Sequence, residues 1–273
     1  MTDRLSRERY RPRLFFALRR AAGDYYDRLG LTAAGSAILT LALLGAAAAG
    51  AAFGRALAGP AGPLVAGIAV WYAGAFGWTI NLLIAHRIAG YEEPGMDAVR
   101  DAFREYGVGV MKLATLDFVI TAVMALDAAF FLVQKSRVMQ VAGVITAYIL
   151  LLWLLAMLWH GPFLIRENRR TAVILKKSAL LTLDNPVFTA GAFFVTITAG
   201  LILAATGIGA VLALGGFVSC LAVRLHRELL KKYEIVEDEP EVIEDGGWPS
   251  SAGPPRRLTP RERGARGTGK AYG

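Results

Sequence analysis

The sequence is poor in charge, in cysteine and in histidine. Only 19% of its 273 residues are charged, whereas about a quarter are charged in an average soluble domain. The single cysteine, Cys220, excludes an intramolecular disulfide framework and any metal site built from several cysteines. What remains is apolar, since hydrophobic residues make up 55% of the chain and the mean hydropathy is +0.45. This composition excludes an ordinary soluble domain and indicates a membrane protein.

Charge is missing, or nearly so, from five long windows. They cover residues 31–53, 64–86, 113–133, 138–165 and 187–223. A helix needs about 20 apolar residues to cross a hydrocarbon core of roughly 30 Å. The fifth window holds 37 residues, enough for two helices if the chain turns at 206–209 (TGIG). We therefore predict an all-α polytopic membrane bundle of six transmembrane helices, at about 31–53, 64–86, 113–133, 138–165, 187–205 and 208–223.

The distribution of basic residues tests this count independently. Six spans place 27 of the 30 Lys and Arg on the side of both termini and only Arg55, Lys135 and Arg137 on the other. Because basic loops stay in the cytoplasm, we predict a multi-pass protein with both termini cytoplasmic. A cleaved signal peptide is the rival interpretation of 31–53. The 30 residues before this run are too many for a normal n-region, and the run is too long for an h-region.

The sequence divides into three segments of different composition. Residues 1–30 form a basic cytoplasmic or interfacial segment, in which arginines alternate with Leu14, Phe15, Leu18, Tyr25 and Tyr26. This mixture favours a helix in the inner headgroup layer over a DNA-binding arm, so we expect no nucleic acid partner. Residues 31–234 form the membrane domain. Residues 235–273 form a cytoplasmic tail with an acidic block followed by a Gly-, Pro- and Arg-rich block, and we predict disorder there.

Two further cytoplasmic segments are predicted as short interfacial helices. After Pro94, Met96, Val99, Phe103 and Tyr106 fall on one apolar stripe. In the segment 166–185, the basic residues gather within one third of the helical wheel. Such faces bind lipid or a partner, or are simply solvated, and both alternatives stay open. The candidate contacts to anionic lipid are Arg11, Arg13, Arg19, Arg20, Arg169, Arg170, Lys176 and Lys177.

Polar side chains inside the predicted spans mark a candidate intramembrane site made of Asp117, Asn81 and His160. A carboxylate deep in a bilayer costs about 2.5–3.5 kcal/mol, so Asp117 is expected to face protein or water. Lys112, one to two turns away, is a candidate ion-pair partner. Asp117 either binds a proton or substrate or forms a hydrogen bond that fixes helix packing. Asn81 either lines a polar pocket with nearby aromatic residues or bonds between helices.

The three histidines, His86, His160 and His226, lie near the same ends of the second, fourth and sixth predicted spans. Imidazoles at one depth could bind a metal or sense pH. No zinc-protease spacing of His and Glu accompanies them. We therefore predict no metal, no cofactor and no catalytic residue.

Two patterns bear on helix packing. The spacing of Gly50 and Gly54 predicts close helix contact within the monomer, or dimerisation, so the oligomeric state is left open. Gly161 and Pro162 predict a kink near the end of the fourth span, because proline lacks the N–H that continues the helix.

Four short segments stand at the ends of predicted spans: 90–94 (GYEEP), 161–164 (GPFL), 183–186 (LDNP) and 227–234 (RELLKKYE). Together they resemble the YesL-like bacterial integral membrane family, a family of unknown function, over residues 27–234. The resemblance implies a bacterial plasma (inner) membrane protein, often linked to carbohydrate uptake. It transfers no activity and no site residues.

We expect a non-enzymatic accessory or scaffold protein whose partners are the lipid bilayer, anionic lipids and a membrane transporter. The alternative is a small transporter or channel with Asp117 and Asn81 in its path. No inverted repeat between the two halves supports that alternative. A membrane enzyme ranks third, because polar groups are too sparse for acid–base chemistry.

Overall fold

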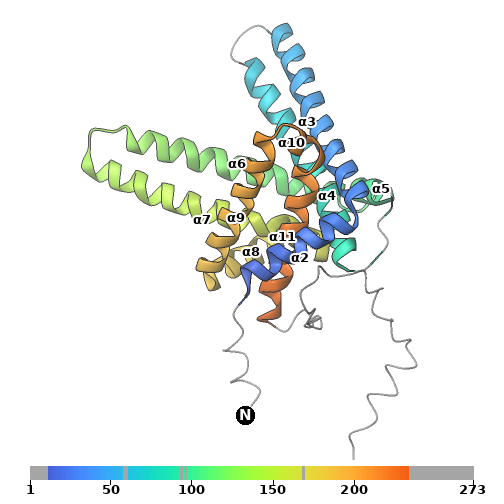
Figure 1. Ribbon diagram of the computed structural model, residues 1–273. Helices are drawn as coiled ribbons and strands as arrows, with labels where there is room; N and C mark the ends of the chain where they lie inside the picture. Colours follow the sequence, from blue (N-terminus) through green and yellow to red (C-terminus); the bar gives the residue numbers. More distant parts are fainter. Residues whose placement is uncertain are drawn as a thin grey trace, which may run out of the picture. The chain divides into compact units, whose positions relative to one another are not determined.

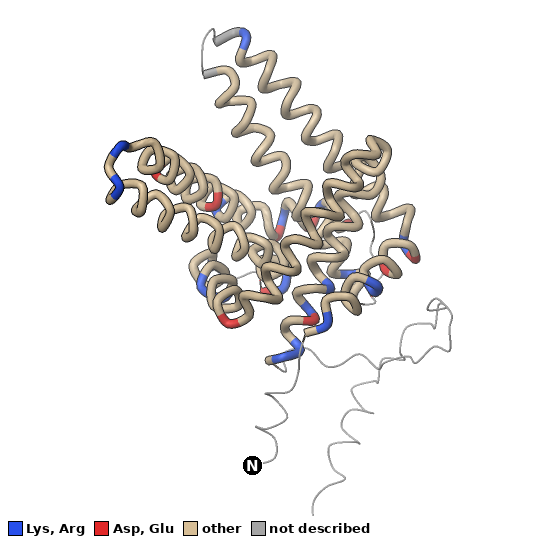
Figure 2. Tube along the Cα trace, turned by 60° about the vertical axis from the view of Figure 1, so that its left-hand side comes forward, with Lys and Arg blue, Asp and Glu red and all other residues tan. Residues whose placement is uncertain are grey.

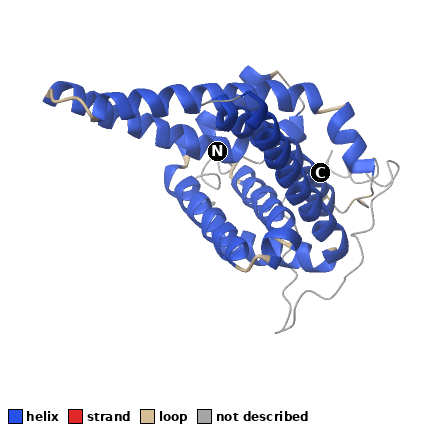
Figure 3. Cartoon of the chain, turned by 90° about the horizontal axis from the view of Figure 1, so that it is seen from above, coloured by secondary structure: helices blue, strands red, loops and turns tan. Residues whose placement is uncertain are grey.

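The computed structural model describes residues 12–57, 61–90, 92, 95, 97–167 and 170–233. Within these ranges every regular element is an α-helix, which confirms the predicted all-α class (Figure 3). In chain order the helices are α2 (Leu14–Asp27), α3 (Leu29–Leu57), α4 (Ala61–Ala89), α5 (Asp97–Arg104), α6 (Gly107–Leu132), α7 (Arg137–Glu167), α8 (Thr171–Asp184), α9 (Pro186–Ala205), α10 (Ile208–Leu212) and α11 (Leu214–Lys231) (Figure 1). The predicted tail 235–273, Arg11 and Arg169 lie outside the described residues.

Among the described residues, five helices are long and apolar enough to cross a membrane. They are Leu29–Arg55, Gly62–Ala89, Gly107–Leu132, Arg137–Glu167 and Pro186–Ala205. These five coincide with the first five predicted spans. Their apolar windows are 11–17% buried in four cases and 44% buried in α4, so α4 is the most enclosed of the five. The outer faces of the others present apolar side chains, as expected where lipid is the solvent.

Small residues let α3 and α4 pack closely. A Cβ added to Gly50 would lie 2.5 Å from the Cα of Ala66, and one added to Gly54 would lie 2.6 Å from the Cα of Gly62. Both distances are below any normal contact, so these positions require glycine. The Gly50–Gly54 pattern therefore packs two helices of one chain together, the first of the two predicted alternatives.

Helices α6 and α7 run side by side and are joined by a short connection that carries Lys135 (Figure 1). Helix α7 continues through Pro162 to Glu167, so the predicted disruption at this proline does not end the helix. At Gly161 an added Cβ would lie 2.4 Å from Leu82 Cδ1. This glycine lets α7 approach α4.

The turn predicted at 206–209 is present and is made by Gly207, whose φ of +64° lies in the left-handed region. Thr206 fixes it, since its hydroxyl donates to the Leu203 carbonyl (2.7 Å) and accepts from the Gly209 N–H (3.0 Å). Glycine is the residue that adopts this conformation without steric cost.

The predicted sixth span, 208–223, is not one continuous apolar helix. The chain breaks at Ala213 between α10 and α11, and α11 carries Arg224, Arg227 and Glu228. Fourteen of the 18 residues of α11 are buried, because α2, α3, α4, α7 and α9 all pack against it. Four of those 18 residues are charged, Arg224, Arg227, Glu228 and Lys231, and this charge is why α11 is absent from the five candidate spans.

Charged residues gather around the short helices α2, α5 and α8 and the end of α11, whereas few lie at the far ends of the α3–α4 and α6–α7 pairs (Figure 2). The buried face of α2 is made by Ala17 and Ala21, while Phe15 is 82% exposed. The buried face of α5 is made by Ala98 and Ala102. Leu14 and Leu18 of α2, and Val99 and Tyr106 in and just after α5, pack partly buried against the same core, so part of the predicted apolar stripes faces protein.

Candidate functional site

A cavity of about 400 Å³ lies between α4, α6 and α7, and it contains the two titratable residues of the predicted intramembrane site. Asp117 of α6 and His160 of α7 line it, together with Trp71 and Trp78 of α4. The remaining wall is mostly aliphatic. Because α6 and α7 form one antiparallel pair, residues 117 and 160 come to the same level although 43 positions separate them.

Asp117 and His160 form a buried pair. The Nδ1 atom of His160 lies 3.0 Å from Oδ1 and 3.3 Å from Oδ2 of Asp117, so the imidazole approaches both carboxylate oxygens. The residues are 7% and 2% exposed. The other imidazole nitrogen, Nε2, has no hydrogen-bond partner among the described residues. The pair can therefore share a proton on one side and still offer a polar atom on the other.

Neighbouring side chains fix the helices around this pair. The indole N–H of Trp71 donates to the Ala114 carbonyl at 2.9 Å, which joins α4 to α6. The indole N–H of Trp153 donates to the Thr121 hydroxyl at 3.2 Å, which joins α7 to α6. The Trp153 ring also meets the His160 ring edge-on, with 5.4 Å between centroids. The imidazole orientation is thus set by packing as well as by the carboxylate.

Asn81, the third predicted member of this site, lies elsewhere. Its side-chain amide donates to the carbonyls of Gly35 (3.0 Å) and Gly77 (2.8 Å), and added Cβ atoms on Gly35 or Gly215 would meet its amide group. Asn81 therefore fastens α4 to α3 beneath α11, the structural role of the two we considered. Asn81 does not join the predicted site: it is not among the residues that line the cavity with Trp71 and Trp78.

Lys112 is not the partner of Asp117. Its side chain is exposed, and no ion pair joins the two within the described chain. Lys112 was expected to pair with Asp117 because the two are close together on one helix. The imidazole of His160, on the adjacent helix α7, lies beside the carboxylate instead.

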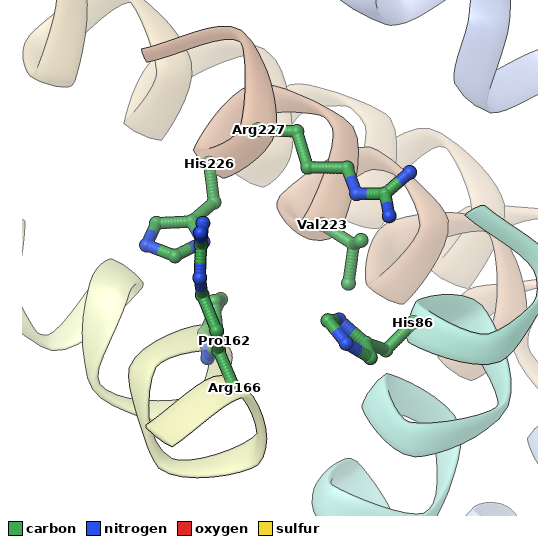
Figure 4. Close-up of a pocket in the computed structure, with 6 residues that line it drawn as sticks. All are labelled: His86, Pro162, Arg166, Val223, His226 and Arg227. Atoms are coloured by element: carbon green, nitrogen blue, oxygen red, sulfur yellow. The ribbon is translucent and has the colours of Figure 1, made fainter. Parts of the chain in front are cut away.

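The histidines do not form one cluster. His86 and His226 line a second cavity of about 210 Å³ with Arg166 and Arg227, and His160 lines the first cavity (Figure 4). No group of three or more His, Cys, Asp or Glu side chains that could hold a metal occurs among the residues the structure describes. Cys220 is buried in α11.

The described predicted lipid contacts lie on α2 and α8 and at the residue immediately before each of these helices. Arg13, Arg19, Arg170 and Lys176 are exposed, as a lipid-binding side chain must be. Lys177 instead pairs with Glu167 at 2.6 Å, and Arg20 lies over the Phe16 ring at 4.9 Å.

Ion pairs hold the short helices to the bundle. The guanidinium of Arg224 on α11 binds Asp24 on α2 through two N–H groups, one at 2.7 Å. Arg87, at the end of α4, binds Asp97 and Asp101 of α5, the first at 2.7 Å. The hydrogen bond from Arg87 lowers the pKa of the exposed Asp97. Neither pairing was predicted, because residue spacing does not show which short helix meets which span.

Two of the segments that carry the family resemblance meet at the ends of α8 and α11. Tyr233 donates its hydroxyl proton to Asp184, Lys232 Nζ lies 3.2 Å from the same carboxylate, and Asn185 donates to the Tyr233 oxygen at 2.7 Å. The Tyr233 hydrogen bond lowers the pKa of Asp184. Burial, together with that hydrogen bond, raises the pKa of Tyr233 to about 12.

Comparison with known proteins gives no match to a family model, to a curated protein or to a solved structure.

Proposed function

We propose that this chain is a six-span membrane protein with both termini in the cytoplasm, and that its membrane is the bacterial plasma membrane, as the YesL-like resemblance implies. The sixth crossing is made by α10 and α11 together, shielded from lipid by the helices around α11. The 27-to-3 distribution of basic residues supports an even number of crossings. The gathering of charged segments around α2, α5, α8 and the end of α11 supports the same arrangement (Figure 2).

Within this topology, the proposed function is non-enzymatic binding and transfer of protons, or of a small cationic solute, at Asp117 and His160. The observation that carries this proposal is a carboxylate–imidazole pair facing a cavity of about 400 Å³ inside the membrane bundle. Asp117 lies ten residues into the 26-residue helix α6, about 15 Å from its start and so well inside the helix. Ionisable groups at this depth typically mark proton or substrate paths. Trp71 and Trp78 add aromatic faces that attract cations.

Proton flux into proteoliposomes tests this function. A pH-sensitive dye trapped inside the vesicles reports entry when a potential is imposed. We expect flux above that of empty vesicles, and at least a tenfold loss in Asp117→Asn and His160→Gln. Asp127→Asn is the matched control, because Asp127 lies on the same helix but is exposed. Flux at the level of empty vesicles, or equal flux in all variants, would exclude the proton path.

An accessory role beside a membrane transporter, linked to carbohydrate uptake, is the second proposal. Supporting it are the exposed basic residues of α2 and α8, including Arg19 and Lys176, on helices that end near α11. Copurification with a sugar permease in mild detergent, reduced by Arg19→Glu and Lys176→Glu, is the expected result. A particle that carries no permease under the same conditions would contradict this role.

A further inference from the structure

The second cavity, of about 210 Å³, is enclosed by the ends of α4, α7 and α11 and shares no residue with the Asp117–His160 site. Its lining consists of His86, Pro162, Arg166, Val223, His226 and Arg227 (Figure 4). Four of these six side chains carry N–H donors, and none of the six is acidic. The volume corresponds to roughly seven water molecules at about 30 Å³ each, which is room for one small oxyanion.

The four donors come from three helices and surround a common space. Figure 4 shows His226 and Arg227 projecting from α11, Arg166 from α7 and His86 from α4. The Arg227 guanidinium donates to the Ala89 carbonyl at the end of α4, which holds it in place beside the cavity. Such a convergence of guanidinium forks from separate elements is typical of phosphate recognition, because each fork can donate two N–H bonds to oxygen.

His226 supplies a polar atom that lacks a partner. The residue is 4% exposed, and its Nε2 has no hydrogen-bond partner among the described residues. Its ring is held edge-on by Phe163, at 4.6 Å between centroids, and tilted against Trp159 at 6.0 Å. A buried polar atom without a partner is costly, and a bound ligand would remove that cost.

We propose that this cavity binds a phosphate group, through the guanidiniums of Arg166 and Arg227 and the imidazoles of His226 and His86. The phosphate belongs either to a lipid headgroup or to a soluble phosphate, and both present the same oxygens to the four donors. In the proposed topology the cavity lies at the cytoplasmic ends of α4, α7 and α11, where both sources are available. The site is distinct from the proton-transfer function, because it involves neither Asp117 nor His160.

The test uses the full-length protein in two arms. In the first, inorganic phosphate is titrated calorimetrically into protein in a non-ionic detergent. In the second, protein in phosphatidylcholine nanodiscs with or without phosphatidic acid is analysed by native mass spectrometry for retained lipid. Binding in the first arm identifies a soluble phosphate, and selective retention of phosphatidic acid identifies a headgroup. Either result supports the site if the variants below weaken it.

Arg166→Gln and His226→Phe are the diagnostic variants. Loss of one charge-assisted hydrogen bond should weaken phosphate binding roughly ten- to a hundredfold for Arg166→Gln. His226→Phe keeps an aromatic ring between Phe163 and Trp159 and removes only the nitrogens, so it decides the question if Arg166→Gln fails to fold. Arg104→Gln, an exposed cation of α5 outside the cavity, should bind as the wild type does. No binding in either arm, or binding unchanged in both variants, would overturn the proposal.

Discussion

At the scale of single residues, the pairing of Asp117 with His160 places two polar side chains where water is excluded. Both side chains are buried, and His160 Nδ1 approaches both oxygens of the carboxylate. Removing His160 leaves the buried carboxylate of Asp117 without its partner, and the loss of one partner from a buried pair with a charged member costs about 3–5 kcal/mol. Replacing both by apolar residues of similar size is often neutral or stabilising. A binding role and a packing role therefore predict different responses to the double variant.

We predict that His160→Ala lowers the free energy of unfolding by about 3–5 kcal/mol, because Asp117 then has no partner for its buried carboxylate. The double variant Asp117→Leu/His160→Leu should be within about 1 kcal/mol of the wild type but should lose proton flux. Denaturant unfolding in detergent, alongside the flux assay, measures both. A double variant as unstable as His160→Ala would mean that the pair is needed for folding itself.

The chemistry of this site was predictable from the sequence, but its geometry was not. Asp117 and His160 stand out because ionisable groups are rare within long apolar windows. Which residues face one another depends on helix rotation and on the pairing of α6 with α7, and hydropathy carries no information on either. Lys112 was therefore assigned to the wrong contact, whereas Asn81 makes the bond between helices that was one of its two predicted alternatives.

At the scale of helices, glycine contacts set how closely the elements approach. Gly50 meets Ala66 of α4, whereas an added Cβ on Gly45 of the same helix would meet nothing within 4 Å. The two positions thus form a matched pair. At Gly50 packing against α4 leaves no room for a larger side chain. At Gly45 there is room, so a substitution changes only the conformational entropy of the backbone.

We predict that Gly50→Ala destabilises the protein by about 1–3 kcal/mol, because the methyl group forces α3 away from α4. Gly45→Ala should stabilise it by about 0.5–1 kcal/mol, since alanine loses less conformational freedom in a helix. Thermal unfolding in detergent measures both changes. Equal effects at the two positions would show that α3 and α4 are not in contact there.

The Tyr233–Asp184 contact predicts a pH dependence at the junction of α8 and α11. It needs a charged Asp184 and a neutral Tyr233. The pKa of Asp184 is lowered, so its contribution is present above about pH 4 and is lost as the pH falls through the folded value. The pKa of Tyr233 is raised to about 12, so its contribution is full below about pH 10 and is lost as the pH rises through 12.

The difference in unfolding free energy between wild type and Tyr233→Phe should therefore be constant from about pH 5 to 9 and shrink on both sides. Its size should be about 1 kcal/mol or less, because the Asp184 side chain is 55% exposed and solvent screens the contact. Denaturant unfolding at a series of pH values gives this difference. A difference that keeps growing above pH 10 would contradict the assigned hydrogen bond.

The sequence predicted where the helices lie along the chain better than it predicted which helices pack around each one. Five predicted spans match α3, α4, α6, α7 and α9, because the length of an apolar run directly reflects bilayer thickness. The predicted sixth span does not match one apolar helix, because α11 carries charged residues. Its charges are accommodated by Asp24 and by the ends of neighbouring helices, and tertiary contacts of this kind leave no periodic signal.

At the scale of the whole chain, the account rests on the number of membrane crossings. Five helices satisfy the length and composition of a span, and the proposed sixth crossing uses α10 and α11. Both cavities acquire their proposed roles from this topology, since it puts the arginine-lined one at the cytoplasmic side. An odd number of crossings would place the ends of α2 and α11 on opposite faces. In the structure the Arg224–Asp24 ion pair joins these two helices.

Cysteine accessibility in intact cells measures the number of crossings most directly. In a Cys220→Ser background, single cysteines replace Gln134 and Thr206 at two turns, and Lys176 and Lys232 on the basic side. Six crossings predict that a membrane-impermeant maleimide labels positions 134 and 206 in intact cells and labels 176 and 232 only after permeabilisation. Labelling of position 232 in intact cells would contradict the account.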